Sequence, residues 1–282
     1  MRIFMLAAVL ASLVSAAPAH SAAPCDDFVR KLPNVKRSLC DAAKLEATAA
    51  RSVRGQTIWM RDIQPPDAQL RVLVLGAIHG DELSSASVAL HWIQLAEQTA
   101  TPWSQAIAWR FVPALNPDGL LAVPPRRVNA NGVDLNRNFP TPNWERDAKV
   151  YWEKRTRKDP RRWPGPKPLS EPETVFLHAE MQRFKPNLIV SIHAPYGVLD
   201  FDGPSVPPSK LGRLYLDQVG IFPGSLGNYG GVHKGVPVVT IELPNSTRTP
   251  LDAEMRQMWL DLLRWMSERM GPGEPVRSPR LP

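Results

Sequence analysis

The residues with the clearest chemistry follow an apolar run at residues 70–77, which has the composition of a strand buried on both faces. His79 and Glu82 come directly after this run and can offer an imidazole nitrogen and a carboxylate oxygen to one metal ion. A second apolar run, residues 187–192, ends in the same way at His193. Two histidines and one glutamate leave a fourth position open, which is typical of a catalytic zinc site. The alternative for His79 is a histidine that only stabilises the turn.

Glu242 lies inside a third apolar run, residues 236–243. Burying a charged side chain there costs free energy, so its presence suggests a function. One interpretation is a buried glutamate paired with an arginine. The other is a general base that deprotonates a zinc-activated water and then protonates the leaving amine. We favour the base, because the three predicted ligands otherwise lack one. The histidines on helical or loop segments are interpreted as surface or groove residues: His91, His178 and His233.

Two polar stretches lie between these runs. Residues 116–119 (NPDG) form a turn by composition. Residues 127–140 contain two arginines and several asparagines. Arginine can hold a carboxylate through two parallel hydrogen bonds. The alternative is that these residues only stabilise the loop.

The elements that must position these residues alternate between strands and helices. Apolar runs predict strands at residues 57–61, 70–77, 108–114, 187–192 and 236–243. Helical spacing of apolar residues predicts helices at residues 83–98 and 252–270. A further helix is expected to begin at Ser170, which can cap it while Glu173 returns the hydrogen bond. This alternation predicts a single α/β domain with a mixed, mostly parallel twisted sheet and helices on both faces, in which ligands bind where strands end.

Residues 1–23 have the features of a secretory signal peptide, namely Arg2, a short apolar core and small residues. Candidate cleavage points follow Ala16, Ala19, Ala22 and Ala23. The apolar core is well short of the roughly 20 residues that span a bilayer, so we expect no membrane anchor. We therefore expect a periplasmic or secreted protein, with a catalytic domain at residues 24–270 and a flexible tail at residues 271–282.

The chain has two cysteines, Cys25 and Cys40, directly after this leader. An export signal and an even cysteine count favour a disulfide between them, whereas two unpaired thiols are the alternative. We expect residues 25–50 to form a helical element that this bond ties together.

The composition, 43% hydrophobic and 22% charged, is that of a globular chain rather than a disordered one. The formal net charge is +7, and much of the excess lies in residues 146–167. Export argues against nucleic acid as a partner. The default interpretation is a solvated basic loop, and another is attraction to a carboxylate-rich substrate such as cell-wall peptide.

Six motifs, in this order along the chain, resemble the zinc metallocarboxypeptidase family. They are HxxE at residues 79–82, NPDG at 116–119, GVDLNRNFP at 132–140, SEPET at 170–174, SIHAP at 191–195 and TIELP at 240–244. The resemblance covers residues 54–263, and within the family it extends to the branch that cleaves the γ-D-glutamyl–diaminopimelate bond of cell-wall peptides. It implies one zinc ion per chain, with His79, Glu82 and His193 as ligands and Glu242 as the base.

The resemblance also implies roles for the arginine-rich loop. Arg127, with Arg126 as the alternative in register, matches the arginine that polarises the scissile carbonyl. Asn136 and Arg137 match the pair that binds the terminal carboxylate of the substrate. Asp134 matches the carboxylate that orients a ligand histidine.

Two positions depart from the family pattern. Digestive carboxypeptidases have an arginine just before the ligand glutamate, where this chain has Asp81. They also have a substrate-contacting tyrosine in the region of residues 219–222, which here read VGIF, so Tyr229 is the remaining candidate. An acid beside the metal favours a substrate with an ammonium group, as in diaminopimelate.

These features predict zinc-dependent hydrolysis of an amide bond next to a free carboxylate, with muropeptides as the substrate. N-acyl amino acid deacylases, of the aspartoacylase and succinylglutamate desuccinylase type, share HxxE and DLNR, but the NPDG, SEPET and NRNFP motifs favour the peptidase. A non-catalytic peptidoglycan-binding protein on the same fold would be expected to have lost a ligand or the base, and all of them are retained.

Overall fold

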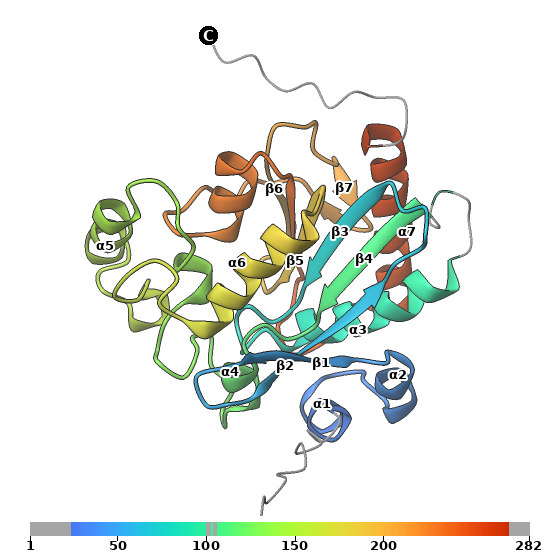
Figure 1. Ribbon diagram of the computed structural model, residues 1–282, viewed down its shortest axis with the longest axis horizontal. Coiled ribbons are helices and arrows are strands. Elements are labelled where there is room, and N and C mark those ends of the chain that lie inside the picture. Colours follow the sequence, from blue (N-terminus) through green and yellow to red (C-terminus); the bar gives the residue numbers. More distant parts are fainter. Residues whose placement is uncertain (1–23, 100–102, 104–105, 271–282) are drawn as a thin grey trace, which may run out of the picture.

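A mixed, seven-stranded sheet runs through the centre of the protein in the computed structural model, and helices cover both of its faces (Figure 1). The structure describes residues 24–99, 103 and 106–270. The expected signal peptide, residues 1–23, and the expected tail, residues 271–282, lie outside the described residues.

The strand order of the sheet is β1-β2-β4-β3-β5-β9-β6. Its strands are β1 (Glu46–Arg51), β2 (Thr57–Ile63), β3 (Leu70–Leu75), β4 (Ile107–Val112), β5 (Leu188–His193), β6 (Val198–Asp202) and β9 (Val238–Glu242). The central strands β4, β3, β5 and β9 are parallel, whereas β1, β2 and β6 pair antiparallel with their neighbours. A separate antiparallel pair consists of β7 (Lys210–Leu211) and β8 (Leu214–Tyr215). The predicted α/β fold with a parallel centre is confirmed.

The two faces of the sheet are covered by different helices. Successive side chains of a strand point to opposite faces, and β3 shows this directly. Val72 and Val74 belong to the core formed with α3 (Leu83–Gln98) and α7 (Asp252–Met270). Leu73 and Leu75 belong to the core formed with α6 (Pro172–Phe184) and the π-helical segment η4 (Gly227–His233). The unbroken apolar run of β3 therefore reflects burial on both faces.

Two short helices, α1 (Cys25–Lys31) and α2 (Arg37–Ala42), precede the sheet and are joined by a disulfide between Cys25 and Cys40. The predicted disulfide is thus confirmed. The prediction of helical structure up to residue 50 is wrong, because residues 46–51 form strand β1, which pairs antiparallel with β2. Local alanine content favours a helix there, but pairing with the exposed edge of β2 overrides that weak preference.

Helix α6 begins at Pro172, and the predicted capping box at its start is wrong. Ser170 donates a hydrogen bond from Oγ to the carboxylate of Glu171 at 2.7 Å, instead of to the helix backbone. The carboxylate of Glu173 accepts a hydrogen bond from Nδ2 of Asn129 at 3.1 Å. Both side chains therefore hold loops together and leave the helix end uncapped.

Shorter helical segments connect the main elements: α4 (Pro117–Leu121), η2 (Leu135–Arg137), α5 (Trp144–Lys154) and η3 (Pro160–Arg162). Most of α5 and all of η3 fall within the basic stretch at residues 146–167, so this stretch is largely folded. Across the described part of the chain, the helices are too short or too polar to cross a membrane.

Candidate metal centre and active site

The predicted metal ligands come from the carboxyl ends of two adjacent strands. His79 and Glu82 lie in the turn between β3 and α3, and His193 is the last residue of β5. Because β3 and β5 pair in parallel, these ends meet at one edge of the sheet. Gly80 allows the turn to approach α4 closely, since a Cβ atom there would overlap the backbone of Gly119.

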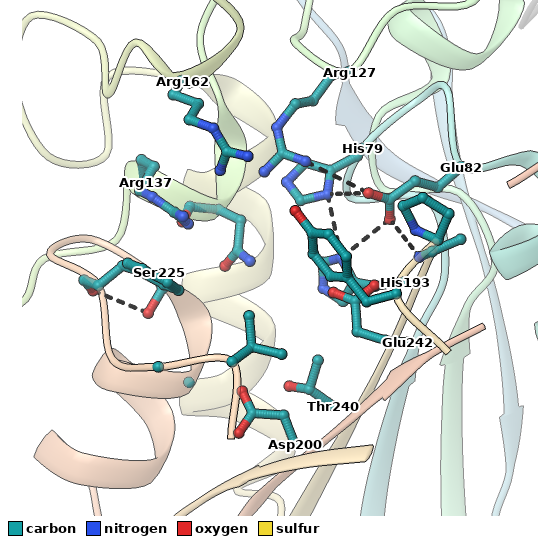
Figure 2. A pocket seen from close by; sticks show the side chains of 18 of the residues that line it. His79, Glu82, Arg127, Arg137, Arg162, His193, Asp200, Ser225, Thr240 and Glu242 are labelled. Carbon is teal, nitrogen blue, oxygen red and sulfur yellow. Dashed lines mark hydrogen bonds and ion pairs between the residues drawn. The ribbon is translucent and has the colours of Figure 1, made fainter. Parts of the chain in front are cut away.

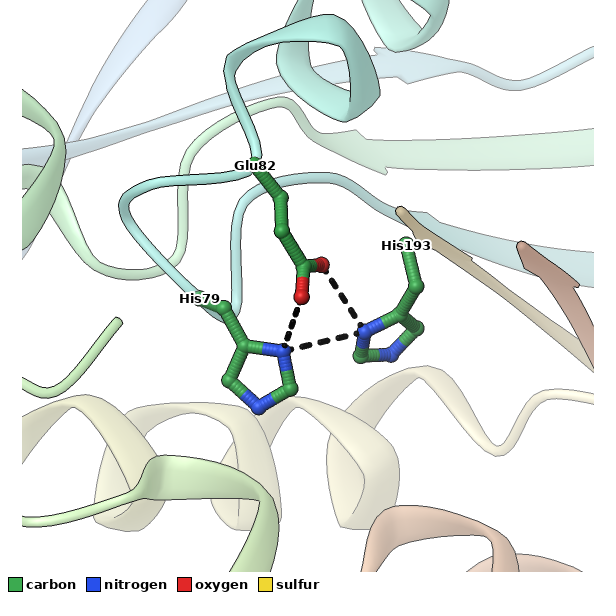
Figure 3. A group of neighbouring side chains, drawn as sticks. All are labelled: His79, Glu82 and His193. Atoms are coloured by element: carbon green, nitrogen blue, oxygen red, sulfur yellow. Dashed lines mark hydrogen bonds and ion pairs between the residues drawn. The ribbon is translucent and has the colours of Figure 1, made fainter. Parts of the chain in front are cut away.

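The three predicted ligands form a compact, buried group (Figure 3). Oε1 of Glu82 is 2.8 Å from Nδ1 of His79, and Oε2 of Glu82 is 3.1 Å from Nδ1 of His193. The two Nδ1 atoms are 3.2 Å apart. In a tetrahedral zinc site with bonds of about 2.1 Å, neighbouring ligand atoms are about 3.4 Å apart. The group therefore needs little widening to hold a zinc ion.

Hydrogen bonding at the other ring nitrogen of His79 also favours a cation at the centre of this group. Nε2 of His79 lies 3.1 Å from Oδ1 of Asp134. Burial raises the pKa of Asp134, but Arg127 and His79 outweigh burial and hold that pKa well below its usual range. An ionised carboxylate can only accept, so Nε2 donates to it and the lone pair of Nδ1 points towards Glu82. Two electron-rich atoms that face each other in this way need a proton or a metal ion between them.

Arg127 is the arginine that faces the site. Its Nε and Nη2 donate to Oδ2 of Asp134 at 3.1 and 3.0 Å, and its Nη1 lies 3.5 Å from Oε1 of Glu82. Asn116 holds this part of the chain, because its Nδ2 donates to the carbonyl oxygen of Arg127 at 3.1 Å while its Oδ1 caps α4. Arg126 is exposed, so the structure selects Arg127 of the two alternatives.

Glu242 lies beside His193, because the two residues are partners in the parallel register of β5 and β9. It is 7% exposed, and its Oε2 has no hydrogen-bond partner among the described residues. Burial raises the pKa of Glu242, an effect that His193 opposes and Glu82 reinforces. No arginine pairs with it within the described residues, contrary to the ion-pair alternative. A buried carboxylate with an available oxygen and a raised pKa is suited to accept and return a proton.

Arg137 is a buried cation without a carboxylate partner in the described structure. It is 4% exposed; its Nη1 donates to the carbonyl oxygen of Asn136 at 2.6 Å, and its Nε has no partner. Its guanidinium lies 4.4 Å from the ring centroid of Phe222. Burial lowers the pKa of Arg137 to about 10. Asn136 is fixed beside it, because its Oδ1 accepts a hydrogen bond from the amide of Leu226 at 2.8 Å.

These groups share one cavity of about 460 Å³, here called the main cavity. The three ligands, Glu242, Arg127 and Arg137 all line it. Figure 2 shows Arg127 and Arg162 on one side and Thr240 and Asp200 on the opposite side, with the ligand histidines next to Glu242. The main cavity therefore brings together the three candidate metal ligands, a buried carboxylate with an available oxygen and a buried arginine that has no ion-pair partner in the described structure.

Two residues suggested by the sequence are placed differently. Asp81 lines the main cavity, but Arg161 donates a hydrogen bond from Nη2 to its Oδ2 at 2.8 Å, so this carboxylate already has a cationic partner. Tyr229 does not line the main cavity. The π-helical segment η4 turns its ring into the core, where it stacks on Phe139 and contacts His178. Its expected contact with substrate is therefore not supported.

The structure also brings residues into the main cavity that sequence reasoning did not select: Tyr151, Arg161, Arg162, Tyr196, Asp200, Asp202 and Thr240. The excess of basic residues at 146–167 could have indicated Arg161 and Arg162 as residues that face a substrate. The sequence Val-Leu-Asp-Phe-Asp of β6 was another signal, since it alternates acids with apolar residues as a strand with one polar face does. His91, His178 and His233 lie outside the metal group, as expected.

Comparison with known proteins identifies the class. The family model for zinc carboxypeptidases matches residues 33–201, and the chain belongs to this family. The chain is 33% identical over 201 residues to murein peptide amidase A of Escherichia coli (strain K12), an alignment that covers 68% of this chain and 79% of that protein. It is 32% identical over 204 residues to murein peptide amidase A of Vibrio campbellii, covering 67% of this chain and 73% of that protein.

Solved structures agree with this assignment. The crystal structure of murein-tripeptide amidase MpaA from Escherichia coli O157 superposes with a TM-score of 0.55 at 31% identity, covering 78% of this chain and 92% of that chain. Carboxypeptidase A from Helicoverpa armigera superposes with a TM-score of 0.60 at 17% identity, covering 84% and 69%, and so supports the fold alone. The protein is thus a zinc metallopeptidase of the carboxypeptidase type.

Proposed function

We propose that the protein hydrolyses the γ-D-glutamyl–diaminopimelate bond of muropeptides, with one zinc ion per chain held by His79, Glu82 and His193. The observation that carries this proposal is that the three ligands, Glu242 and Arg137 line one cavity. The similarity to murein peptide amidases supports cell-wall peptide as the substrate class. The alternatives of a deacylase or a non-catalytic wall-binding protein are not favoured by these comparisons.

The described residues provide the steps of amide hydrolysis. A zinc ion in this site would activate a water molecule and polarise the scissile carbonyl group. Glu242 accepts a proton at Oε2 as the water oxygen bonds to the carbonyl carbon, and it donates that proton to the nitrogen as the C–N bond breaks. Arg127 donates to the carbonyl oxygen as negative charge develops on it. Asp134 orients Arg127 and His79, since it accepts hydrogen bonds from both.

Arg137 and Asn136 bind the terminal carboxylate of the substrate. The Nε of Arg137 has no partner, and no carboxylate of the described structure forms an ion pair with this side chain, so its guanidinium is available for a charge-assisted, bidentate contact. The stacking of Arg137 on Phe222 and the hydrogen bond from Leu226 to Asn136 fix both groups in place. A fixed clamp sets the distance from the carboxylate to the scissile bond, so only a terminal residue is released.

The proposal includes export to the periplasm or the medium. The leader-like residues 1–23 motivate it, and the disulfide between Cys25 and Cys40 supports it, because such bonds persist in oxidising compartments.

The test uses defined muropeptides that end after diaminopimelate, after one D-alanine or after two D-alanines. Mass spectrometry of the products should show release of diaminopimelate from the tripeptide, and little reaction of the two longer peptides, whose diaminopimelate carboxylate is blocked. The Glu242→Gln variant serves as the matched inactive control. Lack of tripeptide cleavage by zinc-loaded wild-type protein would contradict the proposal, as would faster hydrolysis of an N-acetyl amino acid.

A further inference from the structure

The arginines that line the main cavity lie apart from the two acids of strand β6 that also line it. Arg127 lines it from a loop, Arg137 and Arg162 from the short helical segments η2 and η3, and Asp200 and Asp202 from strand β6. Figure 2 shows the side chain of Asp200 next to Thr240, across the cavity from Arg127 and Arg162. A ligand that fills this space meets cationic groups at one end and anionic groups at the other.

Asp202 has an unusual environment for a carboxylate. It is 9% exposed, and no described residue forms a hydrogen bond or an ion pair with its side chain. The nearest charged side chain is Asp200, which is itself 6% exposed and whose Oδ1 accepts a hydrogen bond from the backbone amide of Phe201. A buried carboxylate such as Asp202, with another carboxylate beside it and no described cation paired with it, is unfavourable unless a ligand supplies the opposite charge.

The neighbouring backbone makes room for the Asp202 carboxylate. A Cβ atom at Gly227 would overlap Oδ2 of Asp202, and a Cβ atom at Gly231 would overlap its backbone. Both glycines belong to η4, the π-helical segment, and π-helical turns are frequent at functional sites. The glycines therefore allow this charged group to lie next to the cavity wall.

The position of the acids matches the length of a particular side chain. Asp200 is the antiparallel partner of Thr240, two residues from Glu242 on β9, which places it about 7 Å along the sheet from the base. The distal amino nitrogen of diaminopimelate lies five bonds of about 1.5 Å from its α-carbon, a reach of about 6 Å. An ammonium group at that distance from the scissile bond would meet Asp200 first and Asp202 behind it.

We propose that Asp200 and Asp202 form a subsite for the cationic group at the end of the side chain of the released residue. This assignment rests on the proposed function and names the part of the cavity that selects its substrate. Burial, reinforced by Asp200, raises the pKa of Asp202 to about 6, as expected for a carboxylate that lacks a cation until ligand binds. Asp81 is the weaker candidate for this role, because Arg161 already pairs with it.

The experiment compares two tripeptides, L-Ala-γ-D-Glu-meso-diaminopimelate and the same peptide ending in 2-aminopimelate, which keeps the chain length and the distal carboxylate but lacks the distal amino group. Wild-type kcat/KM should be at least about tenfold higher for the diaminopimelate peptide. Asp202→Asn and Asp200→Asn should each lower kcat/KM for the diaminopimelate peptide by about tenfold or more. Each should change kcat/KM for the 2-aminopimelate peptide by less than about threefold. Absence of a wild-type preference, or equal losses on both peptides, would overturn the assignment.

Asp217→Asn is the matched control, because Asp217 is an exposed acid near Asp200 that does not line the main cavity. The Asp217→Asn variant should keep the wild-type preference for the diaminopimelate peptide. If this variant loses the preference, the effect comes from long-range charge alone and the assignment is overturned. Asp81→Asn should keep the preference as well.

Calorimetry of the free amino acids separates this inference from the proposed function. Zinc-loaded wild-type protein should bind diaminopimelate more tightly than 2-aminopimelate, and Asp202→Asn should remove the difference. That result would support the subsite even if neither tripeptide were cleaved, in which case the proposed function alone would fail. Equal binding of both amino acids, or no binding of either, would overturn the subsite. Thermal denaturation of each variant confirms that it is folded.

Discussion

His193 and Glu242 are direct partners in the parallel ladder between β5 and β9. Each is the last residue of its strand, and both point to the face of the sheet that carries α6 and η4. A slip of one residue in this register would turn Glu242 to the opposite face, into the core against α7. His193 and Glu242 are thus positioned by one set of backbone hydrogen bonds.

Removal of a ligand should remove the metal. We expect purified wild-type protein to contain one zinc ion per chain by elemental analysis and His193→Ala to contain less than about a tenth of that, because two ligands seldom hold zinc against a buffer. His178→Ala is the control, since His178 lies outside the ligand group, and it should keep full occupancy. Full zinc content in His193→Ala would reject the ligand set.

Glu242→Gln should keep the zinc ion and the fold but lower kcat by about 10²- to 10⁴-fold, because the amide cannot accept the proton while its size is unchanged. KM should change little. The measurement is steady-state kinetics on the tripeptide with zinc content checked in the same sample. Activity within a few-fold of wild type would rule out Glu242 as the base.

Arg137→Lys tests the carboxylate clamp. Lysine keeps the positive charge but loses the planar fork, so we expect kcat/KM for the tripeptide to fall by about 10- to 100-fold. The exposed Arg126 gives a matched control: Arg126→Lys should remain near wild type. Equal kinetics for the two variants would show that a bidentate contact at Arg137 is not needed.

Asp202→Asn should make the protein more stable at neutral pH. The pKa of Asp202 is raised from 3.8 to about 6 in the folded protein, so the folded state binds the proton more tightly than the unfolded chain. Stability contributed by this group is therefore full below about pH 4 and is lost as the pH rises through about 6. A shift of this size corresponds to about 2–3 kcal/mol.

Thermal denaturation at about pH 4 and about pH 7.5 measures this effect. The midpoint of Asp202→Asn should exceed that of wild type at the higher pH and approach it at the lower pH. Zinc release at low pH affects both proteins alike, so the difference between them is informative. If Asp202→Asn is less stable than wild type at both pH values, the predicted sign of the stability change is wrong.

Reduction of the disulfide should destabilise the protein. In the chain-entropy model, closing the loop between Cys25 and Cys40 contributes about 3 kcal/mol. The Cys25→Ser, Cys40→Ser double variant should therefore unfold at a lower denaturant concentration, and wild-type protein with reductant should match it. Identical midpoints with and without reductant would show that α1 and α2 contribute little to the cooperative unit.

The metal group could be predicted from the sequence because each ligand follows directly on an apolar strand. A strand end fixes where the next few side chains lie, so His79, Glu82 and His193 needed no knowledge of distant contacts. Asp134 and Arg137 were reached only through resemblance to a family, since nothing in a loop of mixed amides shows which side chain points inward. Their proximity to the ligands depends on how that loop crosses the strand ends.

The acids of β6 were missed for a physical reason. Their place in the cavity depends on β6 pairing antiparallel with β9, a contact between segments that are about 40 residues apart and have no local signal for it. The ring of Tyr229 lies in the core because a π-helical turn directs it there, and the periodicity of a single sequence does not reveal such a turn. The pairing of Asp81 could not be predicted from its distance in sequence from the ligands, because its cationic partner, Arg161, lies in η3, 80 residues away.

The order of strands in the sheet has a consequence for how this protein can evolve. The metal ligands and the base lie on or next to β3, β5 and β9, whereas β6 is the edge strand beyond them and carries neither. Under the assignment of Asp200 and Asp202 made above, a single substitution on β6 alters which terminal residue is accepted and leaves the bond-breaking groups untouched. A descendant of this chain can therefore relax its preference for the terminal residue by a single mutation while it keeps the groups that break the bond.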